Sequence, residues 1–173
     1  MANLKEQTIS IPDGIEAKMD GKIFIVYGPK GTIEKIIGAG VYIELKEGKI
    51  LLNAALKSRK GKRMLNTTKA HINNMISGVT SGYQYKLKIC FGHFPMKVTV
   101  ENNQVNIGNF LGEKIPRKAK ILDKVKVEVQ NDIITVEGAD KESVGQTAAN
   151  IERSTRITNR DRRVFQDGCF ILK

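Results

Sequence analysis

The side chains of this sequence whose types and spacing indicate chemistry are lysines and arginines. They gather in three runs, at residues 57–63, 114–120 and 153–163. The first run, KSRKGKR, holds five basic residues in seven positions and no acid. Clustering of this kind favours contact with nucleic-acid phosphates, because binding releases the counterions condensed on the polyanion. A face that only keeps a protein in solution normally mixes charges of both signs, so we interpret these runs as phosphate-binding.

The basic side chains of the three runs are the residues that we expect to contact RNA. They are Lys57, Arg59, Lys60, Lys62 and Arg63, then Lys114, Arg117, Lys118 and Lys120, and finally Arg153, Arg156, Arg160, Arg162 and Arg163. Acids at Glu113, Asp123 and Asp161 neutralise the two later runs locally. Lys86 and Lys97 stand alone on predicted strands, and we expect them to be ordinary solvated lysines.

The overall charge agrees with a polyanionic partner. The 29 Lys and Arg residues outnumber the 18 Asp and Glu residues, for a formal net charge of +11. Such an excess attracts nucleic acid first and an anionic membrane surface second. Aromatic residues make up only 6% of the chain, which argues against a platform that stacks successive bases. We therefore expect duplex or folded RNA, bound by shape and phosphate. The alternative is a basic interaction module that binds an acidic protein.

Catalysis is not predicted. The sequence has no phosphate-binding loop of the GxxxxGK[ST] or GxGxxG type. Two cysteines and two histidines are too few for a disulfide framework or a zinc finger. Cys90 and His93 are the residues that come closest to a nucleophile with its base. A rival hypothesis is therefore a small enzyme that uses this pair. We expect that this protein is not an enzyme and that it has no cofactor, no metal and no small-molecule substrate.

The N-terminal segment and the cysteines indicate the compartment. MANLKEQTIS lacks the apolar segment of a signal peptide, and no apolar run approaches the length that spans a bilayer. We expect Cys90 and Cys169 to stay reduced. These features predict a cytoplasmic protein that does not enter a membrane.

Hairpins and one helix position the first basic run. Apolar residues alternate with polar ones around predicted turns at Asp20-Gly21 and Glu47-Gly48. Between those hairpins, Gly28-Pro29-Lys30-Gly31 is expected to be a solvent-facing turn. A helix follows the first run, because Leu65, Ile72, Ile76 and Val79 recur with a helical period.

The second half repeats this order. A strand at 83–91 leads to hairpins that turn at Asn102-Asn103 and Asn131-Asp132. Asp140 is a suitable N-cap for a second helix, whose apolar stripe is Val144, Ala148, Ile151 and Thr155. A short strand through Phe170 and Leu172 follows the arginines.

These elements predict an α+β protein of two duplicated domains, 1–81 and 82–173. Each is expected to be a small antiparallel sheet of hairpins covered by one helix, since two hairpins alone leave their apolar face exposed to solvent. Phe110 and Leu111 lie at a predicted loop tip. The sequence leaves open whether they stack on a base or fill the seam between the two units.

Short motifs along the whole chain resemble the universal large-subunit ribosomal protein six family, whose eukaryotic member is also called large-subunit protein nine. The matching segments are QTISIP at 7–12, GPKGT at 28–32, NMISGVT at 74–80, GYQYK at 82–86, HFP at 93–95, NFLGEK at 109–114 and DG at 167–168. The resemblance implies two similar α+β domains, the C-terminal one binding rRNA.

The resemblance also implies a function. It is that of a structural, non-catalytic component of the large ribosomal subunit that supports subunit assembly and cytoplasmic translation. The expected partners are large-subunit rRNA near the factor-binding region and neighbouring large-subunit proteins. The implied location is the ribosome, with nucleolar assembly if the source is eukaryotic.

Overall fold

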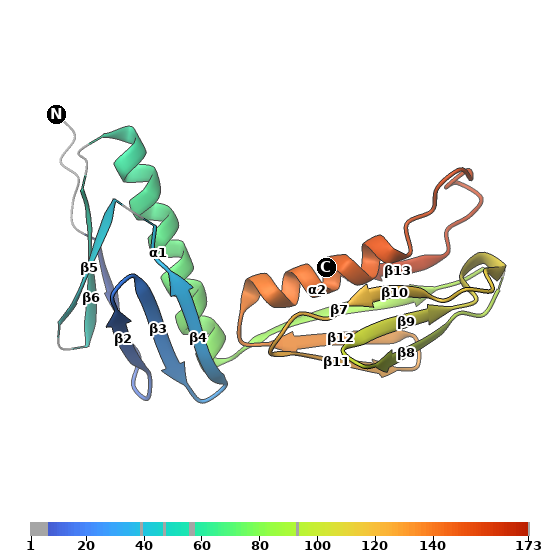
Figure 1. Ribbon diagram of the computed structural model, residues 1–173, viewed down its shortest axis with the longest axis horizontal. Coiled ribbons are helices and arrows are strands. Elements are labelled where there is room, and N and C mark those ends of the chain that lie inside the picture. The colour runs from blue at the N-terminus through green and yellow to red at the C-terminus, as the bar shows by residue number, and fades with distance from the viewer. Residues whose placement is uncertain (1–6, 39, 47, 56–57, 93, 173) are drawn as a thin grey trace. The chain divides into compact units, whose positions relative to one another are not determined.

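The computed structural model describes residues 7–38, 40–46, 48–55, 58–92 and 94–172 (Figure 1). The chain forms two compact units, unit 1 (Met1–Gly82) and unit 2 (Tyr83–Lys173). The elements of unit 1 are β1 (Gln7–Ser10), β2 (Glu16–Asp20), β3 (Ile23–Gly28), β4 (Gly31–Ile36), β5 (Val41–Lys46), β6 (Lys49–Ala54) and α1 (Arg59–Thr80).

Unit 2 repeats this order of strands followed by a helix. Its elements are β7 (Tyr83–Cys90), β8 (Lys97–Glu101), β9 (Gln104–Gly108), the 3-10 turn η1 (Phe110–Gly112), β10 (Arg117–Lys120), β11 (Val125–Gln130), β12 (Ile133–Gly138), α2 (Lys141–Ser154) and β13 (Gly168–Ile171). Over the described residues, neither helix is long and apolar enough to cross a membrane.

The sheet topology shows the duplication directly. Unit 1 has sheets ordered β1-β6-β5 and β2-β3-β4, and unit 2 has β13-β7-β12-β11 and β8-β9-β10, with every pair antiparallel. Strands β7 to β12 therefore take the places of β1 to β6, and β13 is an addition at the β7 edge. The predicted α+β class, with two similar units and one helix in each, is confirmed.

Two details differ from the sequence prediction. The strands of each unit form two small sheets where the hairpins indicated one. The sequence analysis also missed β4 and β10, because each turns only one fully buried side chain inward, Ile33 in β4 and Ala119 in β10. β10 has one apolar residue, and the two isoleucines of β4, Ile33 and Ile36, stand three positions apart, so neither strand shows a period-2 pattern.

Local signals placed the two hairpin turns and the helix of unit 2 correctly. In unit 1 the first turn is centred on Gly21-Lys22, one residue after the prediction, and Glu47 of the second turn lies outside the described residues. Asn102 and Asn103 have φ values of 49° and 61°, the left-handed pair of a type I′ hairpin. The Asp140 carboxylate accepts from the backbone N–H groups of Glu142 (3.2 Å) and Ser143 (3.0 Å), which satisfies two of the free amides at the start of α2.

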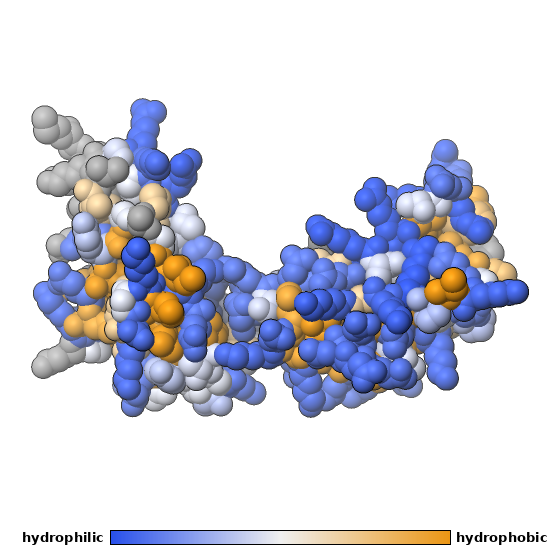
Figure 2. Space-filling model, viewed as in Figure 1, coloured by the Kyte–Doolittle hydropathy of each residue, from blue (hydrophilic) through white to orange (hydrophobic). Residues whose placement is uncertain are grey.

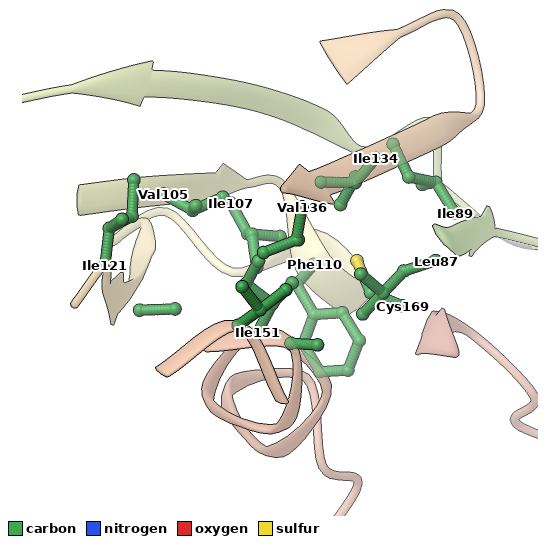
Figure 3. Close-up of a cluster of buried hydrophobic side chains, with 13 residues drawn as sticks. Leu87, Ile89, Val105, Ile107, Phe110, Ile121, Ile134, Val136, Ile151 and Cys169 are labelled. Atoms are coloured by element: carbon green, nitrogen blue, oxygen red, sulfur yellow. The ribbon is translucent and has the colours of Figure 1, made fainter. Parts of the chain in front are cut away.

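The core of unit 2 joins both of its sheets to α2 (Figure 3). Ile107 comes from one sheet, Leu87 and Val136 from the other, and Ile151 from α2, all with no exposed surface. Phe110 is also fully buried in this cluster. This finding answers the question left open by the sequence for Phe110, whose ring fills the core of unit 2 and is not available to a base or to a seam. Leu111 is half-buried and packs against the same cluster.

The turn after β3 is docked on the end of α1. Its backbone N–H at Lys30 donates to the Val79 carbonyl oxygen (3.0 Å), one of the last carbonyls of α1, which have no partner within the helix. A Cβ added at Gly28 would lie 2.7 Å from the Val79 Cβ. The expected solvent-facing turn therefore exposes Pro29 and Lys30 but holds the helix through its backbone.

We predict that Gly28→Ala destabilises unit 1 by about 1–3 kcal/mol, because the added methyl overpacks rigid atoms of α1. Gly38→Ala is the matched control, since its Cβ would meet only the terminal methyl of Met64 at 3.9 Å. Urea unfolding of both variants measures the difference. Equal unfolding midpoints would contradict the close approach.

Candidate nucleic-acid interface

The first basic run forms the first turn of α1. Arg59, Lys60, Lys62 and Arg63 are exposed there, and Lys57 lies outside the described residues. The Ser58 hydroxyl caps the helix by accepting from the Gly61 N–H (3.2 Å). The first turn contains no acid, and none occurs anywhere in residues 59–80.

This charge arrangement opposes the stability of the isolated helix. The N-terminal end of a helix already carries partial positive charge, so cations there are unfavourable and anions are favourable. Four basic side chains without an acid make the start of α1 suited to an external anion. Three of these four side chains also line a shallow trough along the helix, together with polar residues that include Asn66, Thr67 and Asn74. The sequence analysis missed this trough.

The second and third runs come together in unit 2, because β10 lies beside α2 (Figure 1). The Asn150 side-chain amide donates to the Lys120 carbonyl oxygen (3.2 Å), which fixes the two elements side by side. Lys118 and Lys120 are exposed on β10, and Lys114 is exposed in the preceding loop. Figure 2 shows mostly hydrophilic residues on the visible face of α2.

The third run occupies the end of α2 and the loop at 155–167. Its exposed arginines are Arg153, Arg156, Arg160, Arg162 and Arg163. The local acids are engaged within the protein. Asp161 pairs with the Nε of Arg163 (3.4 Å), and the Glu152 carboxylate accepts from the Ile171 N–H (3.1 Å). Positive charge therefore predominates on this side of unit 2.

Arg117 differs from the other predicted RNA contacts. Its guanidinium lies 4.2 Å from the centre of the buried Phe110 ring. Its Nη1 donates to the carbonyl oxygens of Ser154 (3.0 Å) and Arg156 (3.1 Å), and its Nε donates to Glu113 Oε2 (2.8 Å). The structure thus gives Arg117 an internal role, closing the C-terminal end of α2, while its contact with RNA stays a prediction.

Of the two thiols, Cys169 is the one whose environment argues against a role as nucleophile. Burial raises the pKa of Cys169 to about 12, so this thiol stays protonated and is a poor nucleophile at neutral pH. Cys90 is half-buried, and His93 lies outside the described residues. Among the residues that the structure describes, no group of three His, Cys, Asp or Glu side chains is placed to hold a metal ion.

Clustered cationic side chains with few acids are typical of proteins that bind nucleic acid. Comparison with known proteins gives the family. The family description "Ribosomal protein L6" matches residues 11–82 and 94–168. The proteins named "Large ribosomal subunit protein uL6" from Methanosarcina mazei and Ignicoccus hospitalis are 45% and 47% identical to this chain. The alignments cover 96% of this chain and 96% of the relative for the first, and 94% and 91% for the second. This chain belongs to the ribosomal protein L6 family.

We predict that Arg117→Met destabilises unit 2 by about 2 kcal/mol, because two carbonyls lose a charged donor and Glu113 loses its partner. Lys118→Met is the matched control, since Lys118 is the next residue of β10 and is exposed. Chemical unfolding of the two variants measures the effect. A larger loss in the Lys118 variant would contradict the internal role of Arg117.

The Arg117–Glu113 pair also predicts a pH dependence. The hydrogen bond from Arg117 lowers the pKa of Glu113 below its ordinary value of 4.5. The contribution of the pair is therefore fully present above about pH 4.5 and is lost as the pH falls through the lower pKa of the folded state. We expect Glu113→Gln to cost about 0.5 kcal/mol near neutral pH, since the pair is partly exposed. The free energy of unfolding of this variant and of the natural protein is measured at a series of pH values, and the difference between them should vanish in acid. A difference that stays constant with pH would contradict the role of the pair.

Proposed function

We propose that this chain is a structural constituent of the large ribosomal subunit that binds large-subunit rRNA near the factor-binding region. It supports subunit assembly and cytoplasmic translation, with neighbouring large-subunit proteins as further partners and without catalysis or a cofactor. Its location is the ribosome. The relatives reported above are archaeal, so they give no support to the nucleolar assembly expected for a eukaryotic source.

The observation that carries this proposal is the gathering of two basic runs on one side of unit 2. Contacts between β10 and α2 bring Lys118 and Lys120 to the same helix whose last turn carries Arg153. Neighbouring elements of unit 2 thus carry basic residues that are some thirty positions apart in the sequence, and such clustering favours contact with a phosphate backbone.

We also propose that the two units act as separate domains, 1–81 and 82–173, with the C-terminal domain supplying the larger share of rRNA contact. Two of the three basic runs lie in it. The first turn of α1 supplies a second phosphate site from the N-terminal domain. Two sites on independent cores let one protein hold two RNA segments.

The test is the salt dependence of binding to a large-subunit rRNA transcript. Gln replaces Lys118, Lys120, Arg153 and Arg156 in one variant, and Arg59, Lys60, Lys62 and Arg63 in another. Each lost phosphate contact should lower the slope of log K against log salt by about 0.7–0.9, so four lost contacts give a change of about 3.

A matched control removes the same charge elsewhere. Replacing Lys18, Lys22, Lys46 and Lys126 by Gln should leave the slope unchanged, since these lysines lie outside the three runs. An unaltered slope in both interface variants would contradict the assignment of these residues as phosphate contacts. Sedimentation of the tagged chain with the large subunit tests the ribosomal location, and a partner retained after ribonuclease treatment would favour the acidic-protein alternative.

A further inference from the structure

Unit 2 contains a pocket of about 940 Å³ that the proposed phosphate contacts leave unexplained. Its walls are the C-terminal end of α2, the loop that follows it, the end of β7 and strand β13. This volume lies within the range of sites that hold small organic ligands. All of its lining residues belong to unit 2.

Hydrogen bonds between segments far apart in the sequence hold the walls of this pocket together. The Asp167 carboxylate, 2% exposed, accepts from the Gly92 N–H (3.0 Å), which ties the arginine-rich loop to the end of β7. The Thr155 hydroxyl oxygen accepts from the Cys169 N–H (3.0 Å), which ties β13 to the end of α2. A site held in this way is preformed, so its ligand meets a small ordering penalty.

The charged lining of the pocket selects for an anion. Arg153, Arg156 and Arg162 line it. Two carboxylates also line it, and each accepts a backbone N–H, Glu152 from Ile171 and Asp167 from Gly92. Three guanidinium groups against two carboxylates leave the lining one net positive charge. Guanidinium groups bind phosphate oxygens with paired hydrogen bonds.

The apolar lining of the pocket selects for a flat ring. Phe91 and Phe170 are 45% and 41% exposed, and Val164 is 61% exposed, although all three line the same cavity. A phosphate backbone alone gives no reason for exposed aromatic faces beside arginines. A nucleobase does, because its face stacks on aromatic rings while its phosphates take the cations.

We propose that this pocket holds one unpaired nucleotide of large-subunit rRNA, with the base against Phe91 and Phe170 and the flanking phosphates at Arg153, Arg156 and Arg162. This inference rests on the proposed rRNA binding and adds to it a site for a base. An acidic peptide would satisfy the arginines equally, but it would leave the two phenylalanine faces uncovered.

The first test separates stacking from charge. Phe91→Leu combined with Phe170→Leu keeps apolar side chains and removes both aromatic faces. We expect binding to a large-subunit rRNA transcript to weaken about tenfold, with no change in the salt slope, because no phosphate contact is lost. Phe94→Leu is the matched control: Phe94 is 46% exposed in the same unit and does not line the pocket. Unchanged affinity in the double variant would overturn the proposal.

Cys90 supplies a second readout that needs no substitution. It lines the pocket and is half-buried, whereas Cys169 is buried. Saturating rRNA transcript should slow alkylation of Cys90 by iodoacetamide about tenfold or more, and the double Phe variant should regain part of the lost reactivity. Undiminished alkylation together with a normal salt slope would overturn the proposal that the pocket holds a nucleotide, and it would leave the proposed rRNA binding unaffected. A natural protein without salt-dependent RNA binding would overturn both.

Discussion

The burial of one helix stripe in each unit is the constraint on which the structure depends. Sheets of three or four short strands cannot shield their own apolar faces, and within the described residues each unit has one α-helix to cover two such sheets. In unit 2, Val144, Ala148 and Ile151 of α2 are fully buried in the core. Once this stripe is docked, the ends of the helix are fixed, and the basic residues carried at those ends are fixed with them.

The parts of the fold that could be predicted from the sequence are those specified by neighbouring residues. A helical stripe, an N-cap at Asp140 and a left-handed turn at Asn102-Asn103 each depend on a few positions, so pattern reasoning identified them. The division of the strands into two sheets per unit depends on pairing between distant segments. Strands such as β10, whose four residues are three cations and one alanine, carry no local signal of that pairing.

The same distinction explains the site. The runs of Lys and Arg were visible as composition, but the sequence could not say which guanidinium is needed inside the protein. Arg117 and Lys118 are adjacent and both basic, yet strand alternation turns the first onto Phe110 and leaves the second exposed. Phe91 and Phe170 lie far apart in the sequence and come to one pocket only because β13 returns to β7.

Strand β13 has a consequence for the order in which the protein is completed. It pairs with β7 along Gly168–Ile171, and so it anchors the far end of the loop that carries the arginines. The ribosome makes a chain from its N-terminus, so these arginines are synthesised before the strand that anchors them. The pairing of β13 with β7 can form only after the arginines have been made. In a growing chain, the charge of this loop is therefore present before the strand that anchors the loop can pair.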